Sequence, residues 1–88
     1  MAHRIVFRAD FFREDDLYIG LAPELDVSSF GESLEEAKRS LEEAAQAFVE
    51  ECEAMGTLEE VLREADFDWE GNTWLPRVPV ASELLSVS

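Results

Sequence analysis

The sequence predicts an α+β fold in the order β-β-β-α-α-β: an antiparallel three- to four-stranded sheet with one long amphipathic helix on one face, plus a short second helix. Three observations predict this fold. Apolar residues recur at three- and four-residue steps between residues 34 and 55, which is the helical period. Short extended runs with short connections precede this region, as is typical of antiparallel neighbours. A second capping pattern and a last extended run follow it.

The long helix is predicted to lie between two clear end signals. Ser33 and Glu36 form a capping box at its start, and Gly56 is placed for a left-handed stop at its end. About six turns fit between them. The apolar positions of the single stripe are Leu34, Ala37, Leu41, Ala44, Ala45, Phe48, Val49, Cys52 and Met55. We expect this stripe to lie on a flat apolar surface and the opposite, Glu-rich side to face water.

Three strands are expected before this helix, forming a meander. Residues 3–10 alternate between two faces and contain consecutive β-branched and aromatic side chains. Residues 17–22 are the second strand, in which Gly20 indicates either a close backbone approach or a bulge. Residues 27–30 are a short third strand. Residues 11–16, between the first two strands, are predicted to be a polar, acidic connection.

After Gly56 the pattern predicts a second, shorter helix. Thr57 with Glu60 repeats the capping spacing, and the apolar residues that follow give about two turns up to residue 65. Gly71 and Asn72 mark a turn. We expect no second domain, so the prediction is a single domain over residues 1–88.

The C-terminal part is expected to be extended. Residues 74–80 contain Pro76 and Pro79, which lack a backbone N–H, so this segment is predicted to be an edge strand or an arm. Residues 81–88 show no clear period and contain several apolar side chains. Such a tail either frays or crosses to another subunit.

The composition restricts the class of partner. The 88 residues carry 21 acidic and 7 basic side chains, for a formal net charge of −14. This charge disfavours direct nucleic-acid binding, which depends on Lys and Arg, and it disfavours anionic membrane surfaces. It favours basic partners, whose approach it accelerates. Since no signal peptide or membrane-spanning run is visible, we expect a cytoplasmic protein.

The sequence predicts no catalytic, metal-binding or cofactor-binding residue. His3 is the only histidine, and Cys52 lies on the apolar stripe, where a buried thiol is expected. An acidic cluster near the strand ends is compatible with Mg²⁺, but a solvated acidic rim is the favoured interpretation. Its members are Asp10, Asp15, Asp16, Glu24 and Asp26.

Two aromatic pairs are candidate contact residues. Trp69 and Trp74 flank a turn, and they are equally consistent with an interface anchor and with closing the core of a small domain. Phe11 and Phe12 are neighbours in the sequence, so one of them must face outward if the backbone is extended. An outward Phe in an acidic region indicates a contact surface.

Three segments together resemble the HicB-like antitoxin family. They are Asp15–Leu25 (DDLYIGLAPEL), Phe30–Ala37 (FGESLEEA) and the helix ending in Ala47–Glu51 (AFVEE). They are similar to the family's acidic turn, its Y-x-A-x-x-P-E-L strand, its G-x-T/S-x-E-E-A helix start and its acidic amphipathic helix. The resemblance covers about residues 1–55.

This resemblance implies a fold and a partner. Family members are small α+β domains similar to a truncated RNase H core, and they are usually oligomers. They bind HicA toxins, which are small basic proteins that cleave mRNA. The resemblance therefore implies a prokaryotic, non-enzymatic antitoxin that forms a homodimer or higher homo-oligomer. The residues expected to bind the toxin are Asp15, Asp16, Glu24, Asp26, Trp69 and Trp74.

The sequence departs from the family in two places. Residues 26–28 replace the family's usual Pro-Gly-Cys-type turn. Residues 57–88 contain only two bases, Arg63 and Arg77, and no recognisable DNA-binding motif, whereas many family members carry one there. We therefore expect no direct DNA contact.

Two other functions are compatible with the same residues. One is an orphan, self-associating acidic domain without a toxin partner. The other is a metal-dependent, RNase H-like nuclease remnant that would use Asp10 with Asp15 or Glu24. The fold analogy favours the nuclease only slightly, because a fold does not determine a function.

Overall fold

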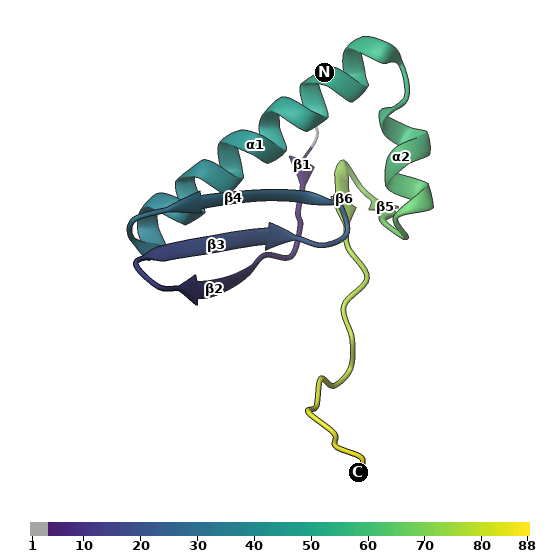
Figure 1. The fold of residues 1–88 in the computed structure, drawn as a ribbon. Helices are drawn as coiled ribbons and strands as arrows, with labels where there is room; N and C mark the ends of the chain where they lie inside the picture. The colour runs from purple at the N-terminus through teal and green to yellow at the C-terminus, as the bar shows by residue number, and fades with distance from the viewer. Residues whose placement is uncertain (1–3) are drawn as a thin grey trace.

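The computed structural model describes residues 4–88 and shows an α+β fold, as predicted. His3 lies outside the described residues. The described chain contains two helices and six strands (Figure 1). In chain order these are β1 (Arg4–Ile5), β2 (Asp10–Glu14), β3 (Leu17–Ala22), β4 (Val27–Gly31), α1 (Leu34–Met55), α2 (Leu58–Glu64), β5 (Asp68–Glu70) and β6 (Thr73–Leu75).

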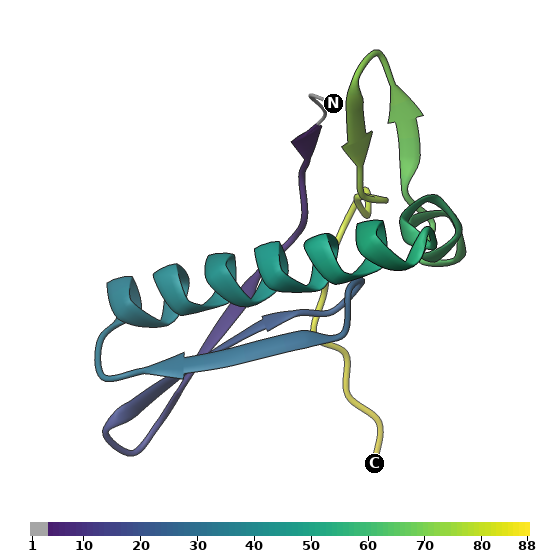
Figure 2. The same cartoon turned by 90° about the horizontal axis from the view of Figure 1, so that it is seen from above.

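The strands form two three-stranded sheets rather than the single sheet expected. One sheet has the order β2-β3-β4 and is antiparallel throughout. The other has the order β1-β6-β5, in which β1 is parallel and β5 antiparallel to β6. Helix α1 lies across one face of the first sheet, and the β5–β6 hairpin stands beside its C-terminal part, next to β1 (Figure 2). The predicted meander with a helix on one face is therefore confirmed.

The first strand of the meander differs from the prediction. Residues 3–10 were expected to form it, but only Arg4–Ile5 are a strand, and they belong to the other sheet. The pairing strand is β2, in the region expected to be a connection. Phe11 and Phe12 favour extended structure, and Asp15 with Asp16 completes a turn of only two residues, which brings β2 directly against β3.

The predicted ends of α1 are confirmed. The Ser33 hydroxyl accepts a hydrogen bond from the Glu36 N–H at 3.1 Å. The Glu36 carboxylate reaches back and accepts one from the Glu32 N–H at 2.7 Å, one residue earlier than in the standard capping box. Gly56 ends the helix with a φ of 73°, in the left-handed region that glycine adopts most easily.

Helix α2 begins where the sequence predicts, but its cap differs. The Thr57 side chain makes no capping hydrogen bond among the described residues. Its hydroxyl instead donates to the Cys52 carbonyl at the end of α1, at 3.4 Å. The backbone N–H of Thr57 donates to the same carbonyl at 2.9 Å, so this residue connects the two helices.

Gly31 lets α1 approach its sheet closely, and Gly20 leaves room for side chains of the neighbouring strands. A Cβ on Gly31 would lie 2.5 Å from the Ala37 backbone nitrogen, and one on Gly20 would lie 3.0 Å from the Phe11 ring. The register of β3 continues without interruption through Gly20, so this glycine marks a close approach and not a bulge. The buried core that results consists of Ala22, Leu25, Ala37, Leu41, Ala45, Cys52, Leu58, Leu62, Phe67 and Trp74.

The prediction that the C-terminal extended segment is an edge strand is wrong, and the alternative of an arm applies to residues 76–88. Strand β6 is the central strand of its sheet, and it ends at Leu75, directly before Pro76. A proline cannot donate to a ladder, so the strand stops there. Residues 76–88, which we call the arm, contain no helix or strand and run away from α1 and from both sheets (Figure 1).

Candidate functional site

The four acidic residues predicted to bind a partner lie in two separate turns. Asp15 and Asp16 form the turn between β2 and β3, whereas Glu24 and Asp26 lie in the turn between β3 and β4. These turns are at opposite ends of β3, about 20 Å apart. The structure therefore does not bring the four residues together into one acidic rim. Their role in partner binding stays a prediction.

Backbone geometry accounts for two of these residues. Asp15 has a φ of 55° and Asp26 a φ of 57°, both in the left-handed region. Aspartate is one of the few residues other than glycine that adopt this region readily, because its short side chain bonds to the local backbone. The turns thus require this residue type independently of any partner.

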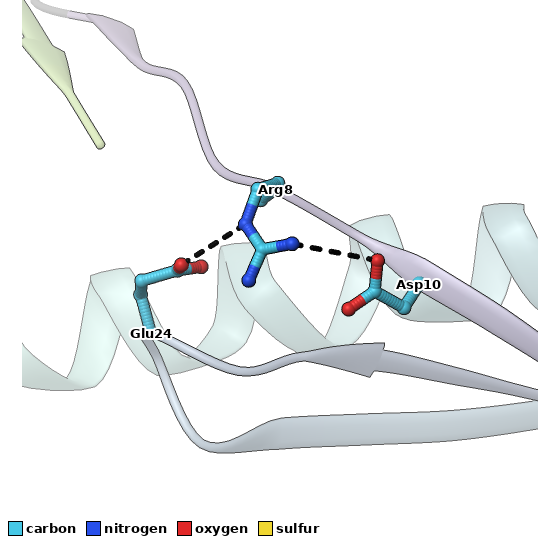
Figure 3. A network of polar contacts seen from close by, with 3 residues as sticks. All are labelled: Arg8, Asp10 and Glu24. Atoms are coloured by element: carbon cyan, nitrogen blue, oxygen red, sulfur yellow. Dashed lines mark hydrogen bonds and ion pairs between the residues drawn. The ribbon is translucent and has the colours of Figure 1, made fainter. Parts of the chain in front are cut away.

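Arg8 connects Glu24 to Asp10 (Figure 3). Its Nε donates to Glu24 Oε2 at 3.1 Å, and its Nη1 lies 3.6 Å from Asp10 Oδ1. The Glu24 side chain is only 17% exposed. Its second oxygen, Oε1, is buried without a hydrogen-bond partner among the described residues. Glu24 therefore contributes to holding the β3–β4 turn against the segment before β2, and little of it is available to a partner.

The described residues do not assemble a metal or nucleophile site. No group of three or more His, Cys, Asp or Glu side chains within residues 4–88 is arranged to hold a metal ion. The guanidinium of Arg8 already occupies the space between Asp10 and Glu24. Ser29 donates its hydroxyl hydrogen to the Ala37 carbonyl at 3.0 Å, and this bond ties β4 to α1.

The sequence left open whether the two tryptophans close the core or anchor an interface. Trp74 closes the core, whereas Trp69 is exposed, as an interface anchor would be. Trp69 on β5 and Trp74 on β6 are directly opposite each other, with ring centroids 5.1 Å apart and planes at 56°. Trp74 is 7% exposed and belongs to the core, whereas Trp69 is 45% exposed. The Arg63 guanidinium lies 5.2 Å from the Trp74 ring centroid. The buried Trp74 ring thus packs against the exposed Trp69 ring and restricts its position.

The sequence around Trp69 is acidic. Its neighbours on β5, Asp68 and Glu70, are both exposed, and the alternation of a strand points their side chains to the face of the hairpin opposite the Trp69 ring. Residues 42–70, which include the second half of α1, α2 and β5, contain eleven acids and a single base, Arg63. We call Trp69 with Asp68 and Glu70 the Trp69 surface. An exposed, rigid aromatic ring on an acidic hairpin suits a partner that presents Arg or Lys.

The face of the β2-β3-β4 sheet opposite α1 has an apolar centre, with Asp10, Glu14 and Ser28 at its edges, and sequence reasoning anticipated only part of it. Phe12, Ile19 and Phe30 are paired across the three strands, and they alternate with residues that face the helix. Leu17 and Leu21 flank Ile19 on the same face. We call these five residues the outer face. The expectation that one of Phe11 and Phe12 faces outward is confirmed, with Phe12 as the outward residue.

Phe30 is the residue of the outer face that could have been found from the sequence. It is 64% exposed, more than the other members. The strand Val27–Phe30 alternates, and Ser29 must face the helix if Gly31 does, which leaves Phe30 outward. In the part of the chain that the structure describes, no helix or strand covers this face.

Two adjoining hollows lie beside α1. They measure about 270 and 300 Å³ and lie between residues 5–11 and the helix. Both are lined by Ile5, Phe7 and Glu42; Gln46 adds to the first and Lys38 to the second. Their lining is therefore mixed, with apolar and polar side chains.

Comparisons with protein-family models, with curated proteins and with solved structures found no match to this chain. No helix in residues 4–88 is both long and apolar enough to cross a membrane. The candidate functional features are therefore two surfaces: the Trp69 surface and the outer face.

Proposed function

We propose that this protein is a non-enzymatic antitoxin-type module that binds a small basic mRNA-cleaving protein of the HicA type and keeps it inactive. The Trp69 surface is the observation that carries the proposal. The proposal also includes the RNase H-like relationship of the fold and a cytoplasmic location in a prokaryotic cell, where mRNA is cleaved. The motif resemblance over about residues 1–55 supports the choice of partner.

The Trp69 surface has the physical properties of a binding hot spot. The ring is half exposed and packed on a buried tryptophan, so little conformational freedom is lost when a partner covers it. Asp68 and Glu70, which flank Trp69 in the strand, are both exposed and project from the opposite face of the same hairpin. Their charges lie close to the aromatic anchor, and negative charge near an anchor favours a basic partner and disfavours an acidic one.

The distribution of charge also favours the Trp69 surface as the binding site. Residues 42–70 alone carry eleven of the 21 acids but only one of the seven bases. Like charges at this density repel one another, which costs stability in the free protein. A basic partner would relieve that repulsion. We therefore infer that the approach of the partner is accelerated electrostatically and slows as salt is added.

The test is neutralisation of a purified partner. A tagged copy of the full chain is used to recover small basic proteins from the source cell at low salt. Each recovered protein is then expressed alone, assayed for growth arrest and mRNA cleavage, and titrated with this chain. We expect one such protein to arrest growth and to be neutralised by the wild type. We expect Trp69→Ala to weaken neutralisation by at least about tenfold, as for a hot spot.

Charge reversals test which surface of this protein binds the toxin. Asp68→Lys with Glu70→Lys should abolish inhibition if the Trp69 surface binds the toxin, whereas Met55→Ala, on an apolar residue of α1 that is more exposed than Trp69, should leave it unchanged. Asp15→Lys with Asp16→Lys, and separately Asp26→Lys, test the two turns. If only the turn variants lose inhibition, the Trp69 surface is the wrong site. If no recovered protein is toxic, the antitoxin proposal is overturned in favour of a self-associating acidic domain.

A further inference from the structure

We propose that the arm of one copy covers the outer face of a second copy, so that two chains exchange arms in a two-fold symmetric dimer. This interaction is separate from the toxin-binding proposal and stands or falls without it. It joins two surfaces of the same chain that both lack a cover within residues 4–88. In the two-fold arrangement each copy gives its arm to its partner and receives the partner's arm, so both contacts are satisfied within the dimer and no surface is left to extend a fibre.

The first surface is too apolar to be an ordinary solvent-facing side of a sheet. Three side chains from three adjacent strands, Phe12, Ile19 and Phe30, form one continuous row, with a leucine on either side of Ile19. Phe12 is 52% and Phe30 64% exposed. A solvated sheet face is normally polar. Contiguous exposed apolar patches on soluble proteins commonly mark interaction sites.

The second surface is the arm itself. Its apolar side chains after Pro79 are largely exposed: Val80, Leu84 and Val87 are between 99% and 107% accessible, and Leu85 is 85%, whereas Val78 nearer the sheet is 70%. The side chains after Pro79 therefore gain little from their own domain. Burying an aliphatic side chain of this size contributes about 1.5–3 kcal/mol, so an uncovered arm forgoes a large stabilisation.

Charge indicates why the occupant is this arm. The chain as a whole has a net charge of −14, and two acidic domains repel each other. The arm, residues 76–88, contains one acid, Glu83, and one base, Arg77, so its formal net charge is zero, unlike that of the rest of the chain. It can lie on the outer face of another copy without adding to the repulsion, and it keeps the acidic helices of the two copies apart.

Two prolines indicate that the contact is made between copies. Pro76 and Pro79 stand at the base of the arm and keep this part of the backbone extended. Figure 1 shows the arm leaving β6 and continuing past the end of the β2-β3-β4 sheet without turning along it, so a bend would be needed to reach its own outer face. Thirteen extended residues reach about 40 Å, twice the length of a six-residue strand, so the arm can span the same face of a neighbour.

The oligomeric state of the purified full chain is the first test. We expect sedimentation equilibrium to give twice the 10.0 kDa chain mass at micromolar concentration. Phe30→Ser should raise the dimer dissociation constant by at least about tenfold. Met55→Ser is the matched control, since Met55 is equally exposed, at 69%, but lies at the end of α1. The double variant Leu84→Ser with Leu85→Ser should dissociate the dimer without affecting the folded domain, because these side chains contact nothing in it.

A mixing experiment distinguishes an arm that lies on the outer face of the other copy from an arm that folds back onto its own sheet. A chain carrying Cys52→Ala and a spin label at Ser86→Cys is mixed with an unlabelled, ¹⁵N-enriched chain. We expect broadening of the amide signals of Ile19 and Phe30 in the ¹⁵N chain. A monomeric wild type overturns the proposal, as does a dimer that neither the Phe30 nor the arm variant weakens. Broadening that occurs only when label and ¹⁵N share one chain also overturns it, because the arm then covers its own sheet.

Discussion

Trp69 and Trp74 are directly paired across β5 and β6, yet they have opposite environments. Their ring centroids are 5.1 Å apart, and the rings are tilted by 56°. Trp74 is 7% exposed and Trp69 45% exposed. The hairpin is therefore a connection between the core and the surface, in which a buried ring fixes the position of an exposed one. This arrangement separates a buried, structural ring from an exposed one at paired positions.

The first prediction follows from this separation. Trp74→Ala should lower the free energy of unfolding by about 3–5 kcal/mol, because it leaves a cavity in the core. Trp69→Ala should lower it by only about 1 kcal/mol, the contribution of a partly exposed aromatic pair. Urea denaturation at one fixed protein concentration measures both values, since an oligomer's stability depends on concentration. Equal losses would show that the two rings do not differ in role.

The second prediction concerns the distance between α1 and its sheet. Gly31→Ala should cost about 3 kcal/mol, because the new Cβ would lie 2.5 Å from the Ala37 backbone nitrogen, which cannot move without shifting the helix. Gly20→Ala is the matched control. Its nearest neighbours are the Phe11 ring at 3.0 Å and the Ser29 hydroxyl, which are side chains and can adjust, so about 1 kcal/mol is expected. Thermal and urea unfolding check the order, and the reverse order would contradict it.

The α+β class, both helices and two strands of the meander could be predicted because their signals are local. The stripe of α1, its capping residues and the Gly56 stop all lie within one segment. The first strand was misplaced because alternation in residues 3–10 is satisfied equally well by a chain that crosses under α1. Only the turn at Asp15 and Asp16 selects residues 10–14 as the partner of β3.

The candidate surfaces were harder to predict because they depend on distant residues. The pairing of Arg4 with Thr73 makes β6 a central strand, and no local pattern contains that information. The same sheet decides which tryptophan is buried. Acidic residues were too numerous for sequence alone to group them, so Asp15 and Glu24 were expected on one rim although β3 separates them.

The third prediction tests the Arg8 connection. In a double-mutant cycle, Arg8→Met with Glu24→Gln should give a coupling energy of about 1 kcal/mol, because Glu24 is mostly buried and its Oε2 lies 3.1 Å from Arg8 Nε. The cycle of Arg8→Met with Asp10→Asn should give less than about 0.5 kcal/mol, because that pair is 3.6 Å apart and solvent-exposed on both sides. Urea unfolding provides the energies. A coupling to Glu24 near zero would mean that the turn containing Glu24 does not depend on Arg8, and a larger coupling to Asp10 than to Glu24 would contradict the predicted order.

The fourth prediction compares the two helix starts, which look alike in the sequence. Ser33→Ala should cost about 1 kcal/mol, since its hydroxyl accepts the Glu36 N–H and satisfies a group that the helix itself cannot. Thr57→Ala should cost less than about 0.5 kcal/mol, because its hydroxyl makes only a long 3.4 Å bond to the Cys52 carbonyl, and the Thr57 backbone N–H already satisfies that carbonyl at 2.9 Å. Urea unfolding of both variants makes the comparison. Equal losses would mean that Thr57 caps α2 in solution, and the spacing of Thr57 and Glu60 would then be a functional capping pattern after all.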